Sequence, residues 1–209
     1  MGNEVKVIIC GMLEKYIDDI MLNHGFKRRK NSIVYSRKVG VSKQKIEMLS
    51  SIHPLSNPSA LAQIYPWYSV YIPELHEIAN EMSGDLTWIK EREFTTRYPI
   101  QIRTDSERWL LWEERQADEL AVKIGDFFKA YTIPLLDELK CGDDYIKMYE
   151  EQDKRIVMDD AFYIFVASAY VQKSDYESGL KVIEKRFGKP GSRKIYASLF
   201  QYFEAKIGE

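Results

Sequence analysis

Eight lysine and arginine residues lie between positions 25 and 46, a stretch that holds no acidic residue. Clustered positive charge of this kind can attract the phosphates of a nucleic acid or the carboxylates of an acidic protein surface. Nearby aromatic rings, including Tyr65 and Tyr68, could add stacking contacts if they lie exposed on the same sheet. The predicted binding surface consists of Lys27, Arg28, Arg29, Lys30, Tyr35, Arg37, Lys38, Lys43, Lys45 and Trp67.

Three interpretations of this basic cluster stay open. The first is structural, because lysines commonly protect the edge of a sheet from aggregation. The second is contact with an acidic protein, and the third is nucleic-acid binding. Charge favours protein over nucleic acid, since residues 1–50 carry a formal charge of +5 and residues 51–209 carry −7. A nucleic-acid-binding domain is usually basic overall, whereas the sequence pI here is near 6.0.

Catalytic and metal-binding patterns are missing from the sequence. His24, His53 and His76 are the three histidines, and they have neither the i, i+4 spacing nor the thiolate neighbours of a metal site. No phosphate loop, dinucleotide fingerprint or nucleophile elbow is present. Adjacent acids such as Asp159 and Asp160 would point about 100° apart on a helix, so they do not form a two-carboxylate site. We predict no metal, no cofactor and no catalytic residue, and an enzyme of an unrecognised type stays an alternative.

The basic cluster is expected to lie on a β-hairpin that follows an amphipathic helix. Apolar residues recur at intervals of three and four through residues 3–24, which predicts a helix with Asn3 as its cap. Gly25 is expected to end this helix in the left-handed conformation, with Phe26 folding back onto it. Pro99 marks the last of the expected strands as an edge candidate. Alternating patterns predict strands at 33–38, 41–51 and 97–103, and a run that is apolar on both faces predicts a central strand at 65–72.

A long helix is expected after the last strand. Thr104 and Glu107 form a capping-box pair, and apolar periodicity continues to about Tyr131. Trp109 and Trp112, three residues apart, would then share one face of this helix. Their expected role is packing, and the alternative is an exposed aromatic anchor for a protein partner.

The remaining pattern completes an α+β fold. After residue 142 the sequence is typical of helices alone, which are expected at 143–151, 159–172, 175–187 and 192–207. We predict an antiparallel sheet of about four strands with helices on one face, plus a small C-terminal all-helical appendage. The α+β domain is expected to span residues 1–150, with the appendage at 151–209 packed on it.

The order of a helix, Gly25-Phe26, basic residues and then a Tyr35-x-Arg37 strand resembles a group of uncharacterised bacterial domains of unknown function. In that group a Gly-Phe with basic residues opens a hairpin that carries a Tyr-x-Arg. The segment 130–137 is similar to the closing helix and proline step of the group. This resemblance covers residues 4–150 and implies an α+β domain with no catalytic residues to carry over. Some similar domains sit beside toxin genes as immunity proteins, and the C-terminal helix pair resembles a single tetratricopeptide unit.

The cysteines and the N-terminus indicate a compartment. Cys10 and Cys141 match no disulfide framework, so a reducing cytoplasm is expected. The N-terminus lacks the pattern of a signal peptide, and no apolar run is long enough to cross a bilayer. We predict a non-enzymatic, cytoplasmic protein-binding domain with an acidic protein partner, and the resemblance implies that it is bacterial and has an immunity-like role. Nucleic-acid binding through the basic hairpin is the alternative.

Overall fold

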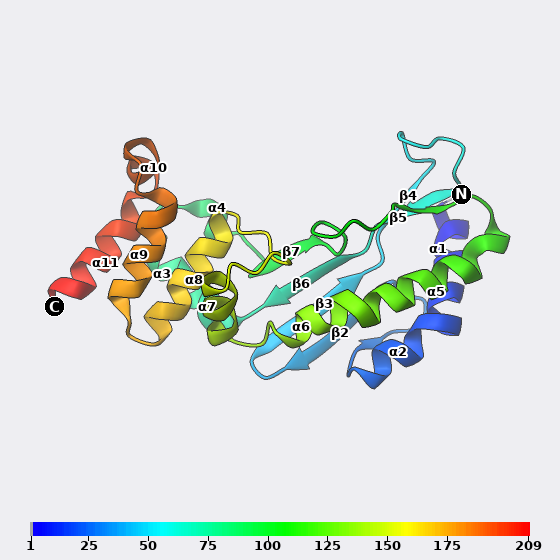
Figure 1. Cartoon of the computed structure of the whole chain (residues 1–209), viewed down its shortest axis with the longest axis horizontal. Helices are drawn as coiled ribbons and strands as arrows, with labels where there is room; N and C mark the ends of the chain where they lie inside the picture. Colours follow the sequence, from blue (N-terminus) through cyan, green and yellow to red (C-terminus); the bar gives the residue numbers. More distant parts are fainter. Residues whose placement is uncertain (1) are drawn as a thin grey trace. The chain divides into compact units, whose positions relative to one another are not determined.

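A computed structural model describes residues 2–209, with side chains from Glu4 onward. It confirms the α+β class, with antiparallel sheets, helices and a C-terminal helical part (Figure 1). The predicted cap Asn3 lies outside the residues whose side chains are described.

The chain forms two compact units that interleave along the sequence. Unit 1 contains the residues up to Val39, Lys43–Ser69 and Arg97–Glu138, and unit 2 contains Gly40–Ser42, Val70–Thr96 and Leu139–Glu209. Strands β3, β6 and β7 therefore contribute residues to both units. The expected domain boundary at residue 150 stays a prediction.

The larger sheet has the strand order β1-β2-β3-β6-β7. Its strands β2, β3, β6 and β7 overlap the four predicted strands, and a two-residue strand, β1, pairs antiparallel with β2. The strand predicted at 41–51 is divided between β3 and a strand of the second sheet at Ser50–Ile52, and the one predicted at 97–103 ends at Pro99. Pro99 lies in the edge strand β7, where its missing N–H does not interrupt a ladder. The bounds are β1 Lys27–Arg28, β2 Val34–Val39, β3 Ser42–Glu47, β6 Trp67–Tyr71 and β7 Thr96–Pro99.

The first helical stretch ends as expected. It consists of α1 (Gly2–Met12), a π-helical turn η1 (Leu13–Ile17) and α2 (Asp18–Asn23). Gly25 has a φ of 79°, and its N–H donates to the Leu22 carbonyl at 2.9 Å. The Phe26 N–H donates to the Met21 carbonyl at 2.9 Å, and this pair of bonds is a Schellman ending. Phe26 is buried, so the turn that starts the hairpin is anchored in the core.

The predicted start of the long helix is wrong. Trp109–Leu111 form strand β8, which pairs antiparallel with β5 (Ala62–Ile64) in a second sheet of order β4-β5-β8. The Thr104 hydroxyl closes a turn instead of capping a helix, because it donates to the Gln101 carbonyl and accepts the Ser106 N–H. A short apolar triplet suits a strand as well as a helix, and here pairing with β5 decides between them.

Helical structure in this part of the chain begins ten residues later than expected. A 3₁₀ turn, η2, has a capping box of its own between Glu113 and Gln116. The stretch then continues without a break to Asp137. Its bounds are η2 Glu114–Gln116, α5 Ala117–Phe127, a π-helical turn η3 Phe128–Thr132 and α6 Ile133–Asp137, and the remaining strand β4 is Ser50–Ile52.

Unit 2 is mainly helical and is built around α8 (Asp160–Gln172). Every residue of α8 from Ala161 to Val171, apart from Tyr163, is buried. It packs against α3, α7 and α9, and α9 packs against α11. These elements agree with the predicted helices, except that Tyr196 divides the last one in two. The bounds are α3 Pro73–Met82, α4 Thr87–Lys90, α7 Gly142–Glu150, α9 Tyr176–Phe187, α10 Pro190–Ile195 and α11 Ala197–Gly208.

His76 gives unit 2 a pH-dependent stability. Its ring lies between those of Tyr71 and Phe165, with centroids 4.6 and 4.8 Å away. Burial, assisted by the positive charge of Arg92, lowers the pKa of His76 from 6.5 to about 4. The folded protein therefore keeps this imidazole neutral at a pH where the unfolded chain binds a proton. The stability that His76 contributes is complete above about pH 6.5 and is lost as the pH falls towards 4.

Replacing His76 with phenylalanine should remove this dependence. Between pH 7 and pH 4.5, we expect the wild-type free energy of unfolding to fall by about 1–2 kcal/mol more than that of His76→Phe, after allowance for solvent screening. Urea unfolding at both pH values measures the difference. Equal falls in the two proteins would show that His76 is not protonated on unfolding.

Candidate functional site

Arg28 and Tyr35 face the helices of unit 1 and not the solvent. They lie opposite each other in β1 and β2. Arg28 donates to both carboxylate oxygens of Asp18 in α2, at 2.9 and 2.5 Å, and the Tyr35 hydroxyl donates to the same carboxylate. Only 4% of the Arg28 side chain is exposed, and Tyr35 is buried. Both residues of the predicted binding surface therefore anchor the hairpin and are not available to a partner.

Arg37 is held in a similar way. Its Nε donates to Gln44 Oε1 at 2.7 Å, its Nη1 to the His24 carbonyl at 2.8 Å and its Nη2 to the Asp137 carboxylate at 2.7 Å. The guanidinium also lies 4.3 Å from the centre of the Phe26 ring. Only 5% of the side chain is exposed. Tyr35 and Arg37, the Tyr-x-Arg of the hairpin, thus join the sheet to α2 and α6.

The opposite face of strands β1, β2 and β3 presents lysines. Successive residues of a strand point to opposite faces, so the partners across the ladder share a face. Lys27 in β1 pairs with Ser36 in β2. The Met48 N–H donates to the Ile33 carbonyl at 2.9 Å, and this register places Ser36 beside Lys45 in β3.

The same register places Lys38 beside Lys43. We call Lys27, Lys38, Lys43 and Lys45 the lysine face, and all four residues are exposed. Arg29 and Lys30 are exposed in the turn that follows β1.

The aromatic residues predicted for stacking do not form an exposed platform. Tyr35 and Tyr68 are 1% and 2% exposed. Trp67 is half-buried, and the Arg97 guanidinium lies 5.0 Å from its ring. Arg97 is itself paired with Glu47 at 3.0 Å. The lysine face therefore carries exposed positive charges, but the aromatic rings predicted to stack beside them are buried or half-buried.

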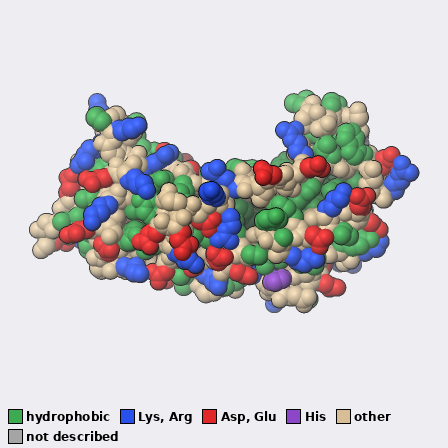
Figure 2. Space-filling view, in the orientation of Figure 1, with side chains coloured by type: hydrophobic (Ala, Val, Ile, Leu, Met, Phe, Trp, Pro, Cys, Tyr) green, Lys and Arg blue, Asp and Glu red, His purple; other side chains and the backbone are tan. Residues whose placement is uncertain are grey.

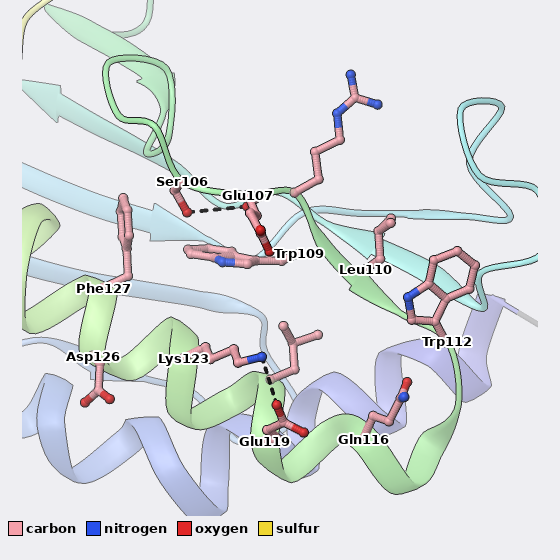
Figure 3. Close-up of a pocket in the computed structure, with 12 residues that line it drawn as sticks. Ser106, Glu107, Trp109, Leu110, Trp112, Gln116, Glu119, Lys123, Asp126 and Phe127 are labelled. Carbon is pink, nitrogen blue, oxygen red and sulfur yellow. Dashed lines mark hydrogen bonds and ion pairs between the residues drawn. The ribbon is translucent and has the colours of Figure 1, made fainter.

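A groove lies between strand β8 and helix α5 within unit 1 (Figure 3). Its volume is about 640 Å³. The β8 side contributes Trp109, Leu110 and Trp112, and the α5 side contributes Lys123 and Phe127. Figure 2 shows hydrophobic side chains gathered over this part of unit 1. We call this hollow the β8 groove.

The two tryptophans do not share a helix face. Trp109 is buried and meets Phe127 edge to face, with centroids 5.2 Å apart. Trp112 follows the end of β8 and is 44% exposed. The amino-acid pattern did not indicate the β8 groove, because it predicts a helix for both residues. The run Trp109-Leu110-Leu111-Trp112 is the signal that a strand assignment would have used.

The side chains that could bind a metal ion do not cluster in the described part of the chain. Across residues 2–209, no three His, Cys, Asp or Glu side chains are grouped closely enough to hold one metal ion. His24 ends α2, and His53 lies in the loop after β4, where its Nδ1 is 3.0 Å from the Ala60 carbonyl. In the same described range, no helix has the length and apolar character needed to cross a membrane.

Comparison with known proteins finds no similar protein. No protein-family model matches the sequence, and neither a curated protein nor a solved structure matches it.

Proposed function

We propose that this chain is a protein-binding domain that contacts an acidic surface of a partner protein through the lysine face. The observation that carries the proposal is the gathering of Lys27, Lys38, Lys43 and Lys45 on one exposed side of β1–β3. The other side of these strands is occupied by the contacts of Arg28, Tyr35 and Arg37. The sheet thus has one face that holds the fold together and one that is open to a partner.

The burial of the aromatic rings beside the lysine face favours protein over nucleic acid as the partner. Single-stranded nucleic acids are commonly held by base stacking on aromatic side chains, and Tyr35 and Tyr68 are buried. The net charge of −2 would also oppose the approach of a polyanion such as duplex DNA. An acidic patch on a protein needs charge complementarity over a limited area only, and a few lysines supply that charge.

A cytoplasmic location is part of this proposal. Cys10 and Cys141 are both free thiols, which fits a reducing compartment. The group of bacterial domains that the sequence resembles suggests an immunity-like role, and the binding test below does not depend on that role.

The proposal predicts that charge reversal on the lysine face abolishes binding to acidic protein segments. The probe is a twelve-residue glutamate-rich peptide, and the readout is the shift of backbone amide signals in β2 and β3 by nuclear magnetic resonance. We expect Lys38→Glu/Lys43→Glu/Lys45→Glu to weaken binding at least tenfold. The control Lys181→Glu/Lys189→Glu/Lys194→Glu makes the same charge change at exposed lysines of unit 2 and should bind as the wild type does.

Duplex and single-stranded oligonucleotides are titrated in parallel. Tighter binding to either oligonucleotide than to the peptide, with a steep loss of affinity as salt rises, would identify a nucleic-acid binder. Equal weakening by the two triple variants would show that the lysine face is not the binding site.

A further inference from the structure

The β8 groove runs along an outer strand of its sheet. In the sheet formed within residues 2–209, β8 is an outer strand that pairs with β5 on one side. The groove is lined by Arg108, Trp109 and Leu110, which are consecutive residues. Since consecutive residues point to opposite faces of a strand, a hollow that all three border lies beside the strand's edge. An edge of this kind offers main-chain N–H and C=O groups to an added strand.

The groove has an aromatic group at each end. Trp109 and Phe127 form one end, where Phe127 also lies 5.0 Å from the ring of Tyr131. Trp112 forms the other end, and Leu120 of α5 lines the hollow as well. Trp109 and Trp112 are three residues apart, and three residues of extended chain span about 10 Å. One extended segment lying along β8 can therefore place a side chain at each end of the groove. Figure 3 shows the two indole rings well apart along the groove.

The charges around the groove balance one another. Glu119 pairs with Lys123 at 2.8 Å, as Figure 3 shows, and Asp126 pairs with Lys129 at 2.6 Å. On the β8 side, Glu107 and Arg108 bring one negative and one positive charge. A strongly charged occupant would gain no complementary field here, whereas a neutral apolar segment would bury the exposed ring of Trp112.

We propose that the β8 groove binds an extended, uncharged segment of a partner protein, which adds a strand to β8 and places a large apolar side chain at each end. This inference rests on the proposal that the protein binds other proteins, but it involves none of the lysine-face residues. A second copy of this chain could instead pair its β8 with this one about a two-fold axis, and light scattering distinguishes that dimer from a bound partner segment.

The test uses a phage-displayed library of random nine-residue peptides, selected on the folded chain. We expect the selected peptides to lack proline, to carry little net charge and to have apolar residues at alternate positions. A fluorescein-labelled selected peptide should bind Trp112→Ala at least tenfold more weakly than the wild type. The matched control is Trp88→Ala, which truncates an exposed tryptophan of unit 2 and should leave the affinity unchanged. Proline at the centre of the peptide should abolish binding, because proline cannot donate to a ladder.

Several results would overturn the proposal. They are a selection that yields no binder, selected peptides that bind Trp112→Ala as well as the wild type, and a dimer in light scattering that Trp112→Ala converts to a monomer. The lysine triple variant should keep the selected peptide while losing the glutamate-rich one. If it loses both, the selected peptide depends on the lysine face and the groove proposal is overturned. If only the glutamate-rich peptide fails to bind the wild type, the proposal for the lysine face is wrong and the groove proposal stands.

Discussion

Replacing Asp18 with alanine is expected to lower the free energy of unfolding by about 2–3 kcal/mol. Asp18 accepts hydrogen bonds from Arg28 and from the Tyr35 hydroxyl. Its removal would leave the guanidinium of Arg28, of which only 4% is exposed, with the Ser32 carbonyl at 2.8 Å and the Glu14 carboxylate at 3.9 Å as its remaining partners. We place the effect below that of a fully buried pair because 34% of the Asp18 side chain is exposed. Urea unfolding at pH 7 measures it.

The neighbouring residue supplies the control. Asp19→Ala removes the same charge from the same helix, but Asp19 is exposed, so a change within about 0.5 kcal/mol is expected. Combining Asp18→Ala with Arg28→Met should recover part of the loss, because the guanidinium charge is then removed as well. If Asp18→Ala and Asp19→Ala had equal effects, the bonds to Arg28 and Tyr35 would contribute nothing to stability.

Acid should weaken the same interaction. Burial would by itself raise the pKa of Asp18, but the hydrogen bonds from Arg28 and Tyr35 outweigh it and bring the pKa below the ordinary 3.8. The stabilisation is therefore complete above the unfolded-state pKa and is lost as the pH falls through the lower value of the folded state. The gap in stability between the wild type and Asp18→Ala should accordingly narrow below about pH 4.

Replacing Gly179 with alanine is expected to destabilise unit 2 by about 2 kcal/mol. Alanine normally favours a helix over glycine, and Gly179 lies in α9. A Cβ at this position would, however, lie 2.6 Å from Cε1 and 2.9 Å from Cζ of Phe203 in α11. The Phe203 ring is buried and cannot move aside without disturbing the contact between the two helices.

Gly191 in α10 is the matched control. A Cβ there would meet no atom within 4 Å, so Gly191→Ala should be neutral or stabilising by up to about 1 kcal/mol. Phe203→Leu should reduce the cost of Gly179→Ala in a double-mutant cycle, because the smaller side chain leaves room for the added methyl group. A stabilised Gly179→Ala protein in thermal unfolding would contradict the tight packing of α9 on α11.

Local patterns predicted the regular elements well where they were long or carried their own end signals. The apolar period predicted the first helical stretch. The Gly25-Phe26 pair predicted its ending, which is the observed Schellman turn. Alternation found β2 and β3. These features depend on residues a few positions apart, so the amino-acid order alone specifies them.

The error at Trp109 had a physical cause. Three apolar residues satisfy a strand and a helix equally, and the choice depended on Ala62–Ile64, the partner strand more than forty residues earlier in the chain. No pattern within the segment contains that information. The β8 groove was missed for the same reason.

The sequence by itself determined that eight positive charges and no negative charge lie between positions 25 and 46, and that they surround a hairpin in an α+β protein. Only the tertiary structure decided which way these charges point. Arg28 and Arg37 turn inward because the carboxylates of Asp18 and Asp137 lie within hydrogen-bonding distance, and those acids come from helices 10 and 100 residues away in the chain. Lys27, Lys38, Lys43 and Lys45 are left on the open face because the two-sided geometry of a strand assigns alternate residues to opposite sides.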